Sequence, residues 1–179
     1  GAALTLEKYL PHAAGIGSGS SDAAAALAML AALWGVAPLP ATAPEVLALG
    51  ADVPVCLAGP TPTRMTGMGE VLSPVVSLPD CALVLARPLV DVPTGPIFTA
   101  LAGRFGDPMP PVPEAMDFDG FARWLSQQRN DLLRPAMSLV PPVGEAIDKL
   151  QSLPAVAAAG MSGAGATCYG LVKDMATAR

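Results

Sequence analysis

Residues 14–25 read Ala14-Gly-Ile-Gly-Ser-Gly-Ser-Ser-Asp-Ala-Ala-Ala25, so three glycines and three serines stand directly before an alanine-rich stretch. The alanines predict a helix over residues 21–34 that ends near Gly35. Unpaired N–H groups at the start of a helix attract phosphate, and glycines allow a ligand to approach the backbone closely. Ser20 or Ser21 can cap the helix, or its hydroxyl can reach a phosphate oxygen or Mg²⁺. Two interpretations stay open: a flexible turn before a capped helix, and a phosphate-binding loop.

Three better-known motifs are excluded by single positions. A Walker A loop requires a lysine after its last glycine, and this segment contains none. The dinucleotide motif G-x-G-x-x-G fails because Ser20 occupies the position of its last glycine. The esterase motif G-x-S-x-G fails at Ala164, which follows Gly160-Met-Ser162-Gly where a glycine is required.

Two further segments contain residues suited to chemistry. Asp52 stands two residues after Gly50 and two before Pro54, which suits either a helix cap or a carboxylate that accepts a hydroxyl proton or holds a metal. The stretch Gly160-Met-Ser-Gly-Ala-Gly165 lies between two apolar runs and is either a tight hairpin or a second ligand loop. Two anion-competent loops in one short chain favour a nucleotide or diphosphate ligand.

The composition excludes several other classes of protein. The chain has 179 residues, is 52% hydrophobic and 14% charged, and has a net charge of −5. It has no cluster of basic residues, so nucleic acid is not an expected partner. No apolar run is long enough for a membrane span, so no membrane partner is expected either. The three cysteines and one histidine lack the spacing of a disulfide framework or a zinc site, and we expect a cytoplasmic protein.

Short strands and helices are predicted along the rest of the chain without a strict βαβ order. The expected strands are residues 4–6, 61–65, 71–77, 82–86, 156–159 and 167–172. The expected helices are residues 45–49, 94–102, 118–127, 131–138 and 143–153. We expect 61–65 and 71–77 to form a hairpin, 82–86 to be buried, and 106–113 to be a proline-rich connection. This mixture predicts the α+β class.

The segments, in this order, resemble the GHMP kinase superfamily, which has a glycine- and serine-rich phosphate loop without the Walker lysine and a late glycine-rich turn. The stretch 6–24 resembles its phosphate loop, and Gly50-Ala-Asp-Val-Pro54 resembles its catalytic motif. Further matches are Gly67–Glu70 with Pro74, Asn130–Leu132 and Met161–Thr167. Asp22 after the serine pair is typical of the branch that phosphorylates a cytidine diphosphate-linked methylerythritol, whereas Ser18 stands where the family usually has glycine.

The resemblance implies a two-lobed fold. Residues 1–77 would be the remainder of an N-terminal lobe like domain 2 of ribosomal protein S5. Residues 78–179 would be a ferredoxin-like C-terminal lobe with an incomplete last helix. Both ends look cut, and the family's N-terminal strand with its catalytic lysine would precede residue 1. We interpret Lys8 as an exposed surface charge beside the loop, not as a replacement for that lysine.

The resemblance also implies the activity and the roles of individual residues. The reaction would be transfer of the ATP γ-phosphoryl group to the 2-hydroxyl of the diphosphocytidyl methylerythritol, a step toward isoprenoid precursors, with ATP and Mg²⁺ required. Asp52 would be the catalytic residue, Ser20 or Ser21 would hold Mg²⁺, and Ser162, Gly163, Ala164 and Gly165 would lie near the substrate or the transferred phosphate. The ATP-binding residues would be Pro11, His12, Ala13, Ala14, Gly15, Ile16, Gly17, Ser18, Gly19, Ser20 and Ser21. The alternatives are a homoserine or mevalonate type of kinase, and a non-catalytic phosphate-binding module; the oligomeric state is left open.

Overall fold

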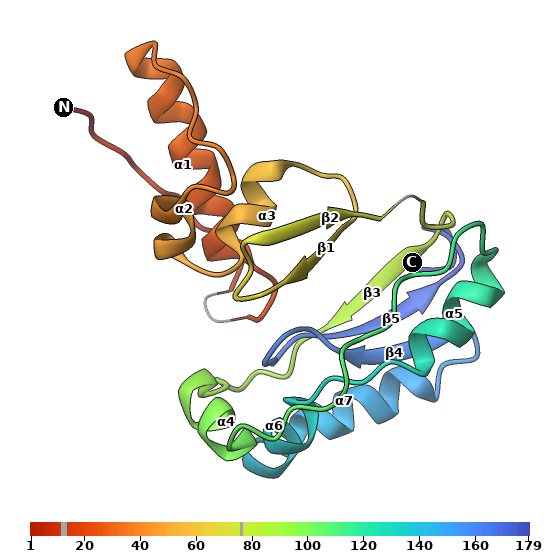
Figure 1. The fold of residues 1–179 in the computed structure, drawn as a ribbon. Coiled ribbons are helices and arrows are strands. Elements are labelled where there is room, and N and C mark those ends of the chain that lie inside the picture. The colour runs from red at the N-terminus through yellow and green to blue at the C-terminus, as the bar shows by residue number, and fades with distance from the viewer. Residues whose placement is uncertain (12–13, 76) are drawn as a thin grey trace. The chain divides into compact units, whose positions relative to one another are not determined.

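The computed structural model describes residues 1–11, 14–75 and 77–179, and the chain divides into two compact units. The first unit comprises residues 1–12 and 17–77, and the second comprises residues 13–16 and 78–179. The residues of the glycine loop are therefore divided between the two units, since residues 14–16 belong to the second unit and the helix that follows belongs to the first. Figure 1 shows the elements of each unit in order along the chain.

The first unit is built on an alanine-rich helix. Its elements are α1 (Ser18–Trp34), α2 (Pro44–Leu49), α3 (Val53–Ala58), β1 (Thr63–Thr66) and β2 (Val71–Pro74). Alanine favours the helical conformation, and α1 ends where Gly35 adopts a left-handed φ of 62° and its N–H bonds the last carbonyls. Helix α1 packs against α3 around the small side chains of Ala24, Ala43, Val46 and Val53. Small residues at this contact allow the helices to approach closely.

The expected hairpin is confirmed, although its strands are shorter than predicted. Strands β1 and β2 pair antiparallel, with Thr63 opposite Pro74 and Thr66 opposite Val71. The expected strand at residues 4–6 is wrong, because no described strand pairs with it. Leu4 and Leu6 are exposed, so no sheet face covers the alternating leucines.

In its described residues, the second unit has a three-stranded antiparallel sheet and four helices. Its strands lie in the order β3-β5-β4. The elements are β3 (Ala82–Ala86), α4 (Thr94–Leu101), α5 (Phe118–Ser126), α6 (Leu133–Leu139), α7 (Pro142–Gln151), β4 (Ala158–Met161) and β5 (Cys168–Val172). Residues 106–113 have no regular structure, as predicted. The antiparallel pairing and the separate helices confirm the α+β prediction.

Both faces of this sheet are covered near its centre. Cys168 and Leu171 on β5 are three residues apart, so their side chains point to opposite faces. The Cys168 face packs against Val143 and Ile147 of α7, and the Leu171 face packs against Phe121 of α5. Figure 1 shows α5 and α7 beside β4 and β5.

Strand β3 is not the buried strand that its sequence predicts. It is an edge strand in which only Ala82 is buried, while Leu83 and Leu85 are 52% and 57% exposed. An apolar run does not distinguish a central strand from an edge strand, because that depends on which neighbours pair with it. Among the described residues, no helix has both the length and the apolar character needed to cross a membrane.

Candidate functional site

In the first unit, the start of α1 has the features of an anion site. Gly17 precedes the helix with a left-handed φ of 69°, and no side chain caps this end. The first recorded bond at the helix start runs from the Ser21 N–H to the Gly17 carbonyl at 2.9 Å. Within the described part of the chain, no acceptor is recorded for the N–H groups of Ser18, Gly19 and Ser20. These donors point along a helix axis whose N-terminal end is positive, so they suit a phosphate. The expected serine cap is therefore not formed.

Asp52 lies at the start of α3 but does not cap it. Its carboxylate accepts no cap hydrogen bond and is exposed. Burial, and secondarily the negative charge of Asp52, raise the pKa of the nearby Cys56 thiol. Since the local sequence suggested either a cap or a functional carboxylate, the missing cap bond leaves the carboxylate available for a ligand.

The turn that carries Asp52 lies next to the start of α1 and is packed closely by the β1–β2 turn. A Cβ on Gly50 would lie 3.9 Å from Ser20 Oγ, so this turn and the start of α1 are neighbours. A Cβ on Gly69, which has a φ of +126°, would lie only 2.1 Å from the Ala51 carbonyl oxygen. The β1–β2 turn therefore packs directly on the residue before Asp52, and only glycine fits there.

Lys8 is not the exposed surface charge that its sequence suggests. Its side chain is 14% exposed and forms an ion pair with Asp22, near the start of α1. The pair occupies the carboxylate of Asp22, so that residue is not a free negative charge beside the helix end. The sequence places the two residues far apart, and only the fold brings them together.

In the second unit, the other part of the glycine loop is bound to the late glycine turn. The Ala14 carbonyl accepts a hydrogen bond from the Thr167 N–H at 3.1 Å, and the Gly15 carbonyl accepts one from Ser162 Oγ at 2.7 Å. A Cβ on Gly15, which has a φ of +71°, would lie 2.2 Å from the Gly165 carbonyl oxygen. The structure therefore brings Gly15 together with Ser162 and Gly165.

The late glycine turn is a hairpin connection with its own hydrogen bonds. It joins β4 to β5, whose last pair is Met161 with Cys168. The Ser162 N–H bonds the Thr167 carbonyl, and the Gly165 N–H bonds the Ser162 carbonyl, each at 2.9 Å. The hairpin interpretation is correct for this turn, and a ligand would meet an already ordered loop.

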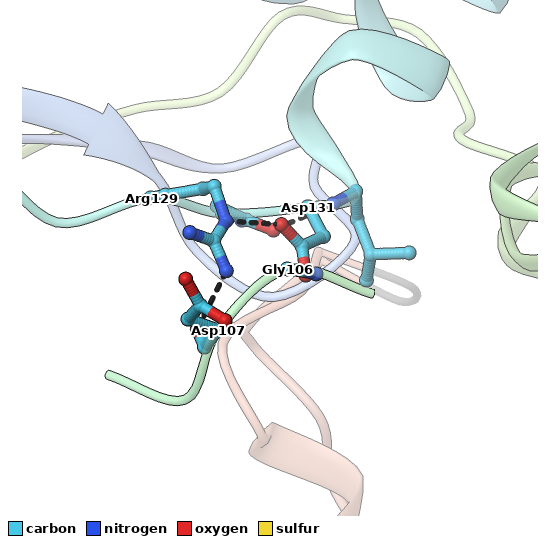
Figure 2. A network of polar contacts seen from close by, with 6 residues as sticks. Gly106, Asp107, Arg129 and Asp131 are labelled. Carbon is cyan, nitrogen blue, oxygen red and sulfur yellow. Dashed lines mark hydrogen bonds and ion pairs between the residues drawn. The ribbon is translucent and has the colours of Figure 1, made fainter. Parts of the chain in front are cut away.

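Asn130 is a residue of this region to which the sequence assigned no role. Its side-chain amide donates to the carbonyls of Met161 and Gly163, at 3.1 and 2.8 Å, and its oxygen accepts from the Leu132 N–H. The family match at Asn130–Leu132 pointed to this residue in the sequence, but it did not show what the side chain binds. Figure 2 shows how its neighbours Arg129 and Asp131 bind each other and residues 106–107.

The remaining predicted residues have simple outcomes. His12 and Ala13 lie outside the described residues. Pro11 is exposed, and Ile16, Gly17 and Ser18 are half-buried. Ser18, which stands where the family usually has glycine, is the first residue of α1, which starts three residues before its predicted start at residue 21. A right-handed helical position accepts any L-residue, so serine fits the backbone there.

Comparison with protein families gives two matches within one family. The model described as "GHMP kinases N terminal domain" matches residues 1–60, and "GHMP kinases C terminal" matches residues 112–179. A crystal structure of 4-(cytidine 5'-diphospho)-2C-methyl-D-erythritol kinase superposes with a TM-score of 0.73 and 32% identity. That match covers 96% of this chain and 62% of the other.

Curated relatives are more similar in sequence. A 4-diphosphocytidyl-2-C-methyl-D-erythritol kinase of Cereibacter sphaeroides is 52% identical over all of this chain and 64% of its own length. Proteins of the same name from Paramagnetospirillum magneticum and a Jannaschia species are 51% and 48% identical, again over all of this chain. The chain spans about 63% of the length of these two relatives.

Proposed function

The chain belongs to the GHMP kinase family, and we propose that the protein containing it transfers the γ-phosphoryl group of ATP to the 2-hydroxyl of 4-diphosphocytidyl-2-C-methyl-D-erythritol. The observation that carries the proposal is identity of about half over the whole chain with relatives named for that activity. Phosphoryl transfer depends mainly on positioning and on neutralising negative charge, and the geometry of each unit suits these tasks.

The proposed triphosphate site is the segment from Pro11 to Ser21. Its support in the first unit is the group of N–H donors at the start of α1 that have no recorded acceptor among the described residues. Its support in the second unit is the fixed conformation of Gly15, whose carbonyl is held by Ser162. Donors that are already oriented before the ligand binds avoid the loss of conformational entropy that ordering them on binding would cost.

Asp52 is the proposed acceptor of the substrate's hydroxyl proton. A carboxylate in this role must be free of competing hydrogen bonds and accessible to the substrate, and Asp52 is exposed and caps no helix. The close approach of Gly69 to the Ala51 carbonyl packs the β1–β2 turn against the turn that carries it. We assign the orientation of the acceptor hydroxyl to Asp52 as well.

Mg²⁺, which ATP-dependent phosphoryl transfer normally requires, would be held by a serine hydroxyl oxygen near the start of α1 and not by the N–H groups there. The described residues include no group of three or more His, Cys, Asp or Glu suited to a metal. Kinase Mg²⁺ ions need only one or two protein ligands, because phosphate oxygens and water supply the rest. The hydroxyl of Ser20 or Ser21 can be such a ligand, and the bound ion would neutralise phosphate charge.

The late glycine turn, Ser162 to Gly165, is assigned to the surroundings of the transferred phosphate or the substrate. The Ser162 hydroxyl already donates to Gly15, so we assign it the task of holding the phosphate loop. This assignment separates the residues that touch the ligand from those that shape the loop around it.

The test is ATP turnover by the full-length protein with three acceptors. We expect ADP release with 4-diphosphocytidyl-2-C-methyl-D-erythritol and none with mevalonate or homoserine. Turnover with mevalonate or homoserine alone would reject the proposed substrate. ATP binding without turnover on any acceptor would reject the kinase and leave a phosphate-binding module.

A further inference from the structure

We propose that Asn130 is a positioning residue that sets the conformation of the late glycine turn and, through Ser162, the position of Gly15 in the phosphate loop. The inference rests on the proposed function for its effect on catalysis. Its structural part stands on contacts within the second unit alone. Every residue that carries it, including residues 14–16, belongs to that unit.

The first step is the position of the Asn130 amide against the turn. Its nitrogen donates to the two carbonyls on either side of Ser162, at Met161 and Gly163. A neutral amide nitrogen has two donors, so both are used on this turn. Asn130 therefore fixes the peptide group between residues 161 and 162 and the one between residues 163 and 164.

The second step leads from Ser162 to the phosphate loop. Its hydroxyl donates to the Gly15 carbonyl at 2.7 Å, and the Thr167 N–H at the other end of the turn donates to the Ala14 carbonyl. Two successive carbonyls of the loop are thus held by the two ends of one turn. A change in the turn must move Ala14 and Gly15 or break these bonds.

The third step explains why Asn130 itself is fixed. Asp131 accepts from the Gly106 N–H at 2.9 Å and from Arg129 Nε at 2.6 Å, while Arg129 Nη2 donates to the Asp107 carbonyl. The residues before and after Asn130 are therefore both tied to the proline-rich connection, as Figure 2 shows. The Gly106 N–H and, after it, the Arg129 guanidinium hold the pKa of Asp131 below its usual value, so the Asp131 carboxylate is charged at neutral pH.

The chemistry of the side chain makes asparagine the required residue here. Aspartate could still accept from the Leu132 N–H, but an ionised carboxylate has no proton to donate and would face two carbonyl oxygens. Alanine would leave the two carbonyls without this partner but would add no repulsion. The order of effects is therefore expected to be Asn130→Asp larger than Asn130→Ala.

The experiment compares both variants with Gln127→Ala in the full-length protein. Gln127 is an exposed amide at the end of α5 whose side chain bonds none of the described residues, so its variant serves as the matched control. Hydrogen exchange of the Gly165 and Thr167 N–H groups is expected to rise at least about tenfold in Asn130→Ala, since the turn loses two hydrogen bonds. The KM for ATP is expected to rise about five- to tenfold in the same variant, with the control unchanged.

The exchange rates and the KM for ATP distinguish a positioning role of Asn130 from a general loss of stability. They also allow this proposal and the proposed function to fail separately. A merely structural role would reduce the active fraction without changing the KM for ATP, and that result would overturn the proposal. Unchanged exchange at Gly165 and Thr167 in Asn130→Ala would also overturn it, while leaving the kinase intact. If the wild-type protein turns over no acceptor, the proposed function fails, and the exchange rates still decide whether Asn130 holds the turn.

Discussion

The two glycine-rich segments of this chain look alike in sequence but differ in how their backbone groups are used. In the late turn, hydrogen bonds occupy the Ser162 and Gly165 N–H groups and the Met161 and Gly163 carbonyls. At the start of α1, the N–H groups of residues 18–20 have no recorded acceptor among the described residues. A glycine-rich loop with its groups already bonded is a support, whereas one with oriented, unbonded donors is suited to bind an anion.

The comparison assigns different tasks to the two segments. The α1 start and the neighbouring Asp52 turn would act on the ligand, and the late turn would hold residues 14–15 in shape. Side-chain changes at the first that leave its backbone unstrained should alter chemistry with little loss of stability, and changes at the second should alter loop geometry and stability. The predictions below can break or sharpen this division.

Asp52→Asn should have the largest effect. We expect turnover to fall by about 10²–10⁴-fold, because asparagine cannot accept the hydroxyl proton. The affinity for ATP should change little, since the phosphate donors are backbone groups of α1. The measurement is steady-state kinetics together with ATP binding by calorimetry in the full-length protein.

The control for this prediction is Asp80→Asn, which removes another exposed carboxylate, in the loop before β3. Its turnover should match the wild type. Normal turnover in Asp52→Asn would show that the Asp52 carboxylate has no part in the chemistry. The proposal that the α1 start and the Asp52 turn together act on the ligand would then be rejected.

A matched pair of glycine variants tests whether the late glycine turn supports Gly15. Gly15 and Gly17 have nearly equal φ values, +71° and +69°, but a Cβ would clash with Gly165 only at residue 15. Gly17→Ala should lower the free energy of unfolding by about 1–2 kcal/mol, from backbone strain alone. Gly15→Ala should lower it by a further ~1–3 kcal/mol, since the turn must move. Urea unfolding measures both, and equal losses would mean that the late turn does not hold Gly15.

Local sequence predicted those parts of the fold that depend on neighbouring residues. The alanine run with Gly35 gave α1 and its end, and residues 82–86 gave the bounds of β3. The burial of β3 could not be predicted, because strand order is set by pairing between distant segments. Leu4 and Leu6 alternate as a strand does, but alternation without a partner strand leaves the segment extended and exposed.

In the candidate site, too, the local motifs could be predicted from the sequence, whereas the contacts between distant residues could not. The glycine loop, the Asp52 turn and the late glycine turn were all visible as motifs, because each is a local backbone requirement. Lys8 with Asp22, Ser162 with Gly15, and Asn130 with Met161 were not visible, since each joins residues separated by 14 to 147 positions. Sequence reasoning therefore identified the segments, and the structure supplied the bonds that connect them.

A pH titration sharpens the picture of the base of the late turn. Burial raises the pKa of the Cys168 thiol from 9.0 to about 11. As pH rises, the thiol of the unfolded chain loses its proton before that of the folded chain. The buried thiol's contribution to the free energy of unfolding is therefore complete below pH 9 and is lost progressively toward pH 11. The free energy of unfolding should fall over this range by about 1–3 kcal/mol more in the wild type than in Cys168→Ala. Parallel pH profiles in urea unfolding would mean that Cys168 is accessible to water, and that the base of the turn is loosely packed.

Ser162→Ala should have the smallest effect and is the most direct test of the link between the two segments. The variant removes the bond from Ser162 Oγ to the Gly15 carbonyl and keeps the backbone bonds of the turn. We expect a loss of about 0.5–1.5 kcal/mol in the free energy of unfolding and a rise of a few fold in the KM for ATP, with kcat nearly unchanged. Ser126→Ala removes a hydroxyl that bonds the Arg123 carbonyl on α5, so it controls for loss of a serine hydrogen bond elsewhere. If both variants lose similar stability but only Ser162→Ala raises the KM, the bond to Gly15 shapes the phosphate loop. A large fall in kcat would instead mean that the Ser162 hydroxyl touches the reacting groups. The late turn would then do more than support the phosphate loop.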